Sequence, residues 1–256
     1  MYLSGEKIKN ALKPEYKNIK ILVFDSIDST NNEAKRLISA GENSVFAVIS
    51  ESQTAGRGRQ NRSFYSPGET GIYMTVVLKP DLPVGKAVKI TVAAAVAVCE
   101  TIEKLTDKKP EIKWVNDIFV GGKKVCGILT EAVPHSNGGN PSVVTGIGIN
   151  VSTESFPDEI KSVAGSLNAK DVDRNILIAD IINRLLSFSE NLENERITDS
   201  YRSRSFVLGR KISFEQNAQS FTAEAIGIDE NCGLIVKLAD GTLKTLTSGE
   251  ISIKLR

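Results

Sequence analysis

The sequence predicts an α+β protein, in which a large N-terminal domain of mixed strands and helices is followed by a small β-barrel. Between residues 1 and 205, short apolar runs rich in β-branched residues alternate with segments of helical periodicity. After Ser205 the pattern changes to five short strands separated by Asn, Asp and Gly turns, which is typical of a small barrel. Because 256 residues can hold a large and a small domain, we expect domains of residues 1–205 and 206–256.

The individual elements follow from periodicity and turn residues. Residues 1–20 are polar, and their helical pattern around residues 8–12 is too short for a helix-turn-helix domain. We expect strands over residues 21–24, 45–50, 71–79, 111–115, 118–120, 123–133 and 143–151, helices over 31–40, 84–105 and 174–192, and barrel strands over 211–214, 221–228, 233–238, 242–246 and 251–255. Gly121-Gly122 predicts a hairpin turn, and Gly146 and Gly148 indicate that another group approaches the backbone of their strand.

The start of the 31–40 helix allows two interpretations. Thr30 and Glu33 have the spacing of a capping box, so Ser29 and Thr30 could simply cap the helix. A helix N-terminus after a strand is also a standard site for a polar ligand group, so the same residues could bind one.

Residues 51–64 form the most distinctive segment, because three arginines stand among two glycines between two expected strands. Gly56 and Gly58 allow a ligand to approach the backbone and leave positive φ free. The guanidinium groups of Arg57, Arg59 and Arg62 suit a carboxylate or a phosphate. The segment is therefore either an ordinary solvated basic turn or an anion-binding loop that folds over the sheet.

Composition excludes several classes of function. A formal net charge of +1 disfavours a protein built to hold long nucleic acid. Cys99, Cys126 and Cys232 are odd in number and far apart, which indicates neither a disulfide framework nor a Cys-x-x-Cys metal site and agrees with a reducing cytoplasm. His135, the single histidine, lies in a Pro- and Gly-rich loop, so a His-based triad or multi-His metal site is excluded. No stretch has the apolar length of a membrane span.

Five motifs occur in order along the chain: Asp28-Ser-Thr-Asn, Gln53-x-x-Gly-Arg-Gly-Arg, Lys113-Trp-x-Asn-Asp, Lys124-x-x-Gly-Ile-Leu-x-Glu and Gly148-Ile-Asn-Val. As an ordered set they resemble the biotin protein ligases (biotin–[acetyl-CoA-carboxylase] ligases), of the monofunctional type that lacks an N-terminal DNA-binding domain. The resemblance implies a central mixed sheet flanked by helices, as in class II synthetases and lipoyl ligases, and an SH3-like C-terminal barrel. It also implies that biotin and ATP, with Mg²⁺, form biotinyl-AMP, and that biotin then passes to a lysine of a biotin carboxyl carrier domain.

The resemblance also assigns roles to residues. Lys124 is expected as the main electrostatic catalyst, together with Arg57. Biotin is expected to be bound by Ser29, Thr30, Asn31, Gln53, Gly56, Arg57, Gly58, Arg59 and Lys124. ATP is expected to be bound by Arg57, Arg59, Arg62, Asn116, Lys124 and Asn150. Asp117 either orients the site, helps to hold Mg²⁺, or caps its turn.

Other functions fit the same sequence less well. Lipoate ligases and octanoyl transferases share the fold, but the Gly-Arg-Gly-Arg loop and the C-terminal barrel favour biotin. A biotin-responsive repressor fragment is the non-enzymatic alternative; because only about 20 residues precede the first core strand, we expect no specific DNA binding. A cytoplasmic protein without membrane attachment is expected, and the resemblance makes a homodimer plausible.

Overall fold

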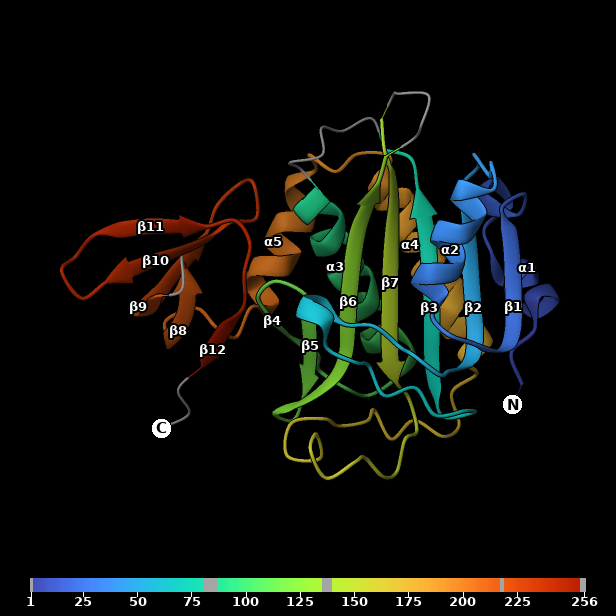
Figure 1. Cartoon of the computed structure of the whole chain (residues 1–256), viewed down its shortest axis with the longest axis horizontal. Coiled ribbons are helices and arrows are strands. Elements are labelled where there is room, and N and C mark those ends of the chain that lie inside the picture. The colour runs from blue at the N-terminus through green and yellow to red at the C-terminus, as the bar shows by residue number, and fades with distance from the viewer. Residues whose placement is uncertain (1, 81–86, 135–139, 217–218, 254–256) are drawn as a thin grey trace.

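The computed structural model describes residues 2–80, 87–134, 140–216 and 219–253, which are organised around two β-sheets (Figure 1). The large sheet is built from β1 (Lys20–Ile27), β2 (Phe46–Gln53), β3 (Gly71–Leu78), β4 (Glu111–Lys113), β5 (Asp117–Val120), β6 (Lys123–Val133) and β7 (Ser142–Asn150). Its strand order is β1-β2-β3-β7-β6-β5-β4. Since β1 and β2 run parallel while the other neighbours run antiparallel, the sheet is mixed, which confirms the predicted fold class.

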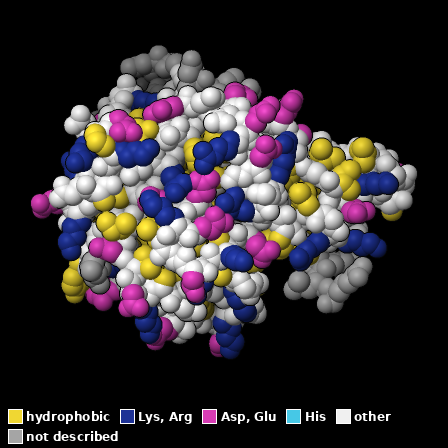
Figure 2. Space-filling view, turned by 180° about the vertical axis from the view of Figure 1, so that it is seen from behind, with side chains coloured by type: hydrophobic (Ala, Val, Ile, Leu, Met, Phe, Trp, Pro, Cys, Tyr) yellow, Lys and Arg dark blue, Asp and Glu magenta, His cyan; other side chains and the backbone are white. Residues whose placement is uncertain are grey.

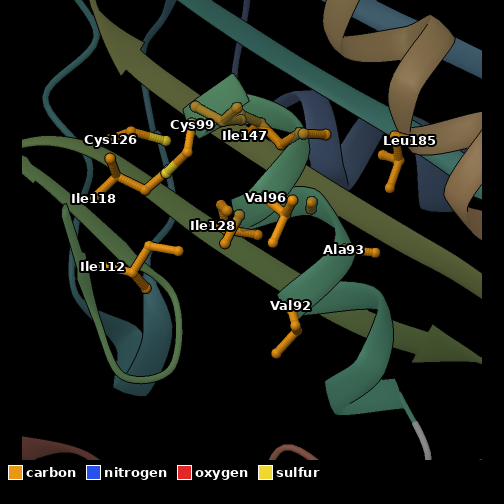
Figure 3. Close-up of a cluster of buried hydrophobic side chains, with 14 of the residues drawn as sticks. Val92, Ala93, Val96, Cys99, Ile112, Ile118, Cys126, Ile128, Ile147 and Leu185 are labelled. Carbon is orange, nitrogen blue, oxygen red and sulfur yellow. The ribbon is translucent and has the colours of Figure 1, made fainter. Parts of the chain in front are cut away.

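Helices cover both faces of this sheet. On one face lie α1 (Gly5–Ala11), α3 (Ala87–Leu105) and α4 (Arg174–Ser189), and on the other lies α2 (Thr30–Ser39), in front of β2 and β3 in Figure 1. Helix α3 is rich in Ala and Val and is buried on nearly all sides, because it lies between the sheet and the neighbouring helices. Figure 3 shows Val92, Val96 and Cys99 of α3 among side chains from the sheet strands. The face that carries α2 leaves room for a pocket.

The small sheet is antiparallel and contains β8 (Lys211–Gln216), β9 (Gln219–Ile228), β10 (Leu234–Leu238), β11 (Leu243–Leu246) and β12 (Ile251–Ile253), in the order β11-β10-β9-β8-β12. Helix α5 (Glu195–Arg204) lies between it and the large sheet. Two buried hydrogen bonds join the β4–β5 turn to α5 and to the loop between β9 and β10. Trp114 Nε1 donates to the Cys232 carbonyl at 3.0 Å, and Tyr201 Oη donates to the Val115 carbonyl at 3.0 Å. The small sheet is thus held beside β4 and β5.

Several predicted boundaries need correction. Strand β4 ends at Lys113 rather than at residue 115, because the next residues turn toward β5, and α4 ends at Ser189 rather than at residue 192. Helix α5 was not predicted from the sequence, since it is strongly polar and buries only Ile197 and Tyr201. The start of the 84–105 helix, the end of the 251–255 strand, and His135 lie outside the described residues.

Of the two interpretations of the start of the 31–40 helix, the capping box is contradicted. The N-cap of α2 is Ser29, whose side chain makes no capping hydrogen bond, and Thr30 is the first helical residue. The hydroxyl of Thr30 donates instead to Gln53 Oε1 at 3.2 Å. The polar side chains at this helix start therefore face away from the helix backbone and toward other elements.

Surface charge follows the near-neutral composition. On the side covered by α3 and α4, Figure 2 shows basic and acidic side chains interspersed, with the small sheet projecting at one edge. Among the described helices, none has both the length and the hydropathy needed to cross a membrane.

Candidate functional site

A pocket opens on the face of the large sheet that carries α2. Its walls come from the start of α2, the end of β2, the arginine loop (residues 54–66), the β4–β5 turn, β6, β7 and the start of β12. It is lined by Ser29, Thr30, Asn31, Gln53, Arg57, Gly58, Arg59, Gln60, Arg62, Ser63, Phe64, Lys113, Trp114, Asn116, Asp117, Lys124, Gly127, Ile128, Leu129, Gly146, Ile147, Gly148, Glu250 and Ile251. The structure therefore brings together residues that are up to about 220 positions apart in the chain.

One wall of the pocket carries uncharged polar groups. Gln53 Oε1 accepts hydrogen bonds from the backbone N–H of Thr30 at 2.9 Å and from its hydroxyl, while Gln53 Nε2 donates to Ser66 Oγ at 2.9 Å. Ser29 is 2% exposed, and its hydroxyl is not used to cap α2. Gln53 and Thr30 are thus held in fixed orientations beside the buried Ser29, which suits recognition of a neutral ligand with several donors and acceptors.

Asn31 lines the same wall, but its amide is engaged by the protein. Its Oδ1 accepts from Thr75 Oγ1 at 2.6 Å, and its Nδ2 donates to the Leu129 carbonyl at 3.3 Å and to Glu131 Oε2 at 2.9 Å. A methyl group on Gly146 would lie only 2.1 Å from Asn31 Oδ1. The structure thus gives Asn31 an internal packing role, and its predicted contact with biotin stays a prediction.

Phe64 forms part of the pocket floor by lying against the glycines of β6 and β7. A methyl group on Gly148 would lie 2.5 Å from the Phe64 ring, and one on Gly127 would lie 3.4 Å from it. The expectation that other groups approach the backbone at Gly146 and Gly148 is therefore confirmed. The approaching groups are protein side chains, Asn31 and Phe64.

The arginine loop is a compact hairpin. Arg57 and Ser63 form an isolated antiparallel bridge, the Gly58 N–H donates to the Arg62 carbonyl at 2.7 Å, and the Phe64 N–H donates to the Gly56 carbonyl at 2.9 Å. Positive φ occurs at Gln60 and Asn61, at 53° and 59°, and Asn tolerates that conformation better than most residues.

The expectation that the loop glycines adopt positive φ was wrong, because φ is −119° at Gly58 and Gly56 is not among the described residues with positive φ. Approach of a ligand to Gly58, which lines the pocket, stays a prediction. A methyl group on Gly56 would lie 2.4 Å from the Phe64 carbonyl oxygen. Gly56 is needed for packing inside the loop, and it is not among the residues that line the pocket.

Each of the three loop arginines interacts with its own set of partners. Arg57 Nη1 donates to Asn32 Oδ1 at 3.1 Å and lies 3.5 Å from Glu131 Oε1. Arg59 donates to Asn116 Oδ1 at 3.1 Å and to the Gly249 carbonyl at 2.9 Å. Arg62 pairs with Glu250 Oε1 at 2.6 Å. Arg59 and Arg62 thus join the loop to the small sheet, with their guanidinium groups on the pocket wall.

Lys124 lies on β6 with its ammonium group in the pocket, where Nζ is 2.7 Å from Asp117 Oδ1 on β5. The side chains of Lys124 and Asp117 are 31% and 21% exposed, so the ion pair is only partly screened by water. A fixed positive charge therefore lies in the pocket close to the cationic loop.

No site role was expected for Lys113, although it belongs to one of the five motifs. The structure places it half-buried on β4 in the pocket wall, opposite Asp117 in the strand register. Burial lowers its pKa, and the nearby Asp117 and Glu250 carboxylates partly offset that effect. Its place in the motif Lys113-Trp-x-Asn-Asp, directly before the polar turn, was the available signal.

Glu131 also belongs to one of the five motifs, and no site role was expected for it. Its carboxylate accepts from Asn31 Nδ2 and from Lys35 Nζ at 2.7 Å, and it faces Arg57. Burial by itself raises the pKa of Glu131, but the hydrogen bonds from Lys35 and Asn31 outweigh it, so the pKa lies below its usual value. Glu131 therefore links α2 to the arginine loop.

The two asparagines expected near the nucleotide lie in different surroundings. Asn116 lines the pocket and is fixed by its Nδ2, which donates to the Ile128 carbonyl at 2.9 Å, and by Arg59. Asn150 lies at the end of β7, outside the residues that line the pocket, and its Nδ2 donates to the Gly165 carbonyl at 2.9 Å.

A metal held by protein groups alone does not fit this pocket. Within the described residues, no three Asp, Glu, Cys or His side chains cluster in a metal-binding arrangement. Mg²⁺ is commonly bound by one or two carboxylates together with substrate phosphates, and Asp117 offers one such carboxylate among the cationic side chains.

Two family models match the chain. The Biotin/lipoate A/B protein ligase family matches residues 23–150, from within β1 to the end of β7. The biotin protein ligase C-terminal domain matches residues 207–254, which include the small sheet.

Individual proteins show the same similarity. The bifunctional ligase/repressor BirA of Bacillus spizizenii is 34% identical over 98% of this chain and 79% of its own length. The biotin–[acetyl-CoA-carboxylase] ligase of Mycobacterium tuberculosis is 29% identical over 87% of this chain and 85% of its own length. Among solved structures, the biotin protein ligase of Aquifex aeolicus in complex with biotin and ATP matches with a TM-score of 0.75 and 27% identity, over 92% of this chain and 98% of that one.

Proposed function

The chain belongs to the biotin protein ligases of the Biotin/lipoate A/B protein ligase family and is an ATP-dependent biotin–protein ligase, and we propose how its pocket performs the reaction. In the first step, a carboxylate oxygen of biotin attacks the α-phosphorus of ATP, the bond from that phosphorus to the leaving pyrophosphate breaks, and biotinyl-AMP forms. In the second step, the amine of an acceptor lysine attacks the acyl carbon, AMP leaves, and the amine loses a proton to complete the amide.

One observation carries this proposal: a single pocket is lined both by uncharged polar groups and by cationic side chains. The wall formed by Ser29, Thr30 and Gln53 suits the ureido group of biotin, which carries no charge but needs its hydrogen bonds satisfied on burial. The cations of the same pocket, Arg57, Arg59 and Lys124, suit the biotin carboxylate and the α-phosphate. Two anions must be brought together there, so positive charge lowers the barrier.

Each cation has a proposed task. Lys124 stabilises the negative charge that develops on the α-phosphate oxygens, and Arg57 neutralises the biotin carboxylate as it approaches. Arg59 and Arg62 contact the phosphates, with Arg62 toward the β- and γ-phosphates. Asn116, which lines the pocket, and Asn150, at the end of β7, are proposed on the adenosine side.

Mg²⁺ is proposed as the partner of the ATP phosphates, whose charge it would neutralise when bound. Asp117 is the described carboxylate best placed to help hold it, because it lies on β5 at the cationic side of the pocket. Asp117 also orients Lys124 through their 2.7 Å ion pair.

We further propose that the acceptor is a biotin carboxyl carrier domain and that the protein acts in the cytoplasm. We also propose that residues 1–205 and 206–256 are its two domains. The matches to relatives named for acetyl-CoA carboxylase support the acceptor class. Three free cysteines, all buried, agree with a reducing compartment. A homodimer is proposed only from the family, and its test is the mass of the protein in solution.

The function is tested by measuring pyrophosphate release from ATP with and without biotin, and transfer of biotin to a purified carrier domain. Release that depends on biotin, followed by mass gain on the carrier lysine, is the expected result. A reaction supported by lipoate but not by biotin would favour the lipoate ligases of the same family. An operator-specific gel shift at physiological salt would contradict the expected lack of specific DNA binding.

A further inference from the structure

Lys124 lies where β6 extends beyond its neighbour β7. The ladder between the two strands begins at the pair Cys126 and Ile149, so Lys124 has no partner on β7. On the other side of β6, Lys124 is paired with Phe119 of β5. The backbone of Lys124 therefore needs a second support.

The loop that follows β7 supplies that support. The Lys124 N–H donates to the Val163 carbonyl at 2.9 Å, and the Gly165 N–H donates to the Lys124 carbonyl at 2.8 Å. Together these bonds make a parallel bridge between Lys124 and Ala164. Residues 163–165 thus continue the ladder at the point where β7 has ended.

We propose that residues 163–165 position Lys124 for the reaction, and that Gly165 is the positioning residue on which this contact depends. The inference rests on the role of Lys124 proposed above. A methyl group on Gly165 would lie 2.4 Å from Cβ of Lys123, and both atoms belong to backbone-fixed positions. Glycine is therefore required for close approach of the loop to β6.

The loop is itself anchored on both sides of Gly165. Asn150 Nδ2 donates to the Gly165 carbonyl at 2.9 Å, and the Leu167 N–H donates to the Asn150 carbonyl at 3.0 Å. Lys123 Nζ donates to the carbonyl oxygens of Ser162 at 2.5 Å and Lys161 at 3.3 Å. The end of β7 and the side chain of Lys123 therefore hold the loop against Lys124.

The first test is Gly165→Ala, with biotin-dependent pyrophosphate release as the readout. Because a misplaced catalytic group costs rate, we expect kcat to fall by about tenfold to a hundredfold. Gly68→Ala is the matched control, since a methyl group there meets nothing within 4 Å, and its kcat should equal that of the unmodified protein. Gly165→Ala with unchanged kcat would overturn the inference.

A double-mutant cycle separates positioning of Lys124 from a general structural role. In a Lys124→Ala background, Gly165→Ala should cause no further loss of kcat, because the group that it misplaces is absent. An equal loss in both backgrounds would overturn the inference.

If Gly165→Ala does not fold, Lys123→Ala provides the same test without adding an atom, because it removes the bonds to the 161 and 162 carbonyls. Lys123→Ala should lower kcat by a smaller factor than the one expected for Gly165→Ala. In the Lys124→Ala background it should not lower kcat further. A loss that persists in Lys124→Ala would overturn the inference. An unmodified protein that releases no pyrophosphate with biotin and ATP would instead contradict the proposed function, and the inference with it.

Discussion

The ammonium nitrogen of Lys124 lies 2.7 Å from Oδ1 of Asp117, across two neighbouring strands of the large sheet. Strands β5 and β6 fix both backbones, so the charged groups have little freedom to separate. A rigidly placed cation can stabilise developing charge without first reorganising. This pair is therefore the electrostatic centre of the pocket, and it gives the most direct tests of the mechanism.

Lys124→Ala should lose catalysis and keep its fold. Removing one preorganised electrostatic stabiliser lowers kcat by about a hundredfold to a thousandfold. Pyrophosphate release measures the rate, and circular dichroism measures the fold, with Lys9→Ala on the exposed face of α1 as the control. Loss of helical and strand signal in Lys124→Ala would show that the residue is structural.

Asp117→Asn tests whether this carboxylate helps to hold Mg²⁺. The amide keeps the shape of the side chain but removes the charge, so the Mg²⁺ concentration for half-maximal rate should rise by about tenfold or more. Glu154→Gln, an exposed acid paired with Lys170, is the control. A lower rate with an unchanged Mg²⁺ requirement would mean that Asp117 only orients Lys124.

Glu131→Gln should show a pH-dependent loss of stability. The pKa of Glu131 is lowered in the folded protein, since the hydrogen bonds from Lys35 and Asn31 outweigh burial. A carboxylate with a depressed pKa stabilises the fold above its ordinary pKa, about 4.3, and loses that contribution as the pH falls through the folded value. Urea unfolding should therefore separate the two proteins at pH 7, and the separation should be smaller at pH 3, below the ordinary pKa.

The control for that comparison is Glu159→Gln, on the exposed loop after β7. It should change the free energy of unfolding little at either pH. A difference between the unmodified protein and Glu131→Gln that is equally large at pH 7 and pH 3 would show that packing, rather than charge, explains the loss.

Tyr201→Phe should weaken the link between α5 and the β4–β5 turn. The ring is fully buried and its hydroxyl donates to the Val115 carbonyl, so the variant leaves a buried acceptor unpaired. The free energy of unfolding should fall by about 1–2 kcal/mol, seen as a lower urea midpoint with an unchanged slope. Tyr65→Phe, at 38% exposure, should have almost no effect, and equal losses in both would contradict this account.

Much of the fold could be predicted because local patterns agree with it. Alternating and apolar runs predicted β1 to β7, and Gly121 and Gly122 adopt the positive φ values of the predicted turn, 57° and 76°. Helix α5 could not be predicted from apolar periodicity, because its contacts depend on only two buried side chains from a very polar segment. Its Asn194 cap was the available signal.

The site was harder to predict in detail, because side-chain partners come from distant parts of the chain. Gln53 and Thr30 could be predicted as neighbours of a ligand, but not as a pair that fix one another. Gly56 was attributed to ligand approach, whereas the space beside it is taken by the carbonyl of Phe64. Such packing depends on how the loop folds back, which no local pattern records.

Gly146 and Gly148 have a consequence for how the pocket tolerates mutation. In an ordinary core, the removal of methylene groups lowers the stability of the fold. On β7 the addition of a methyl group would disturb the packing, because the space above each glycine is already filled by Asn31 or by the ring of Phe64. Even a single added methyl group would push α2 or the arginine loop away from the sheet. The depth of the pocket therefore depends on the absence of a side chain at Gly146 and Gly148.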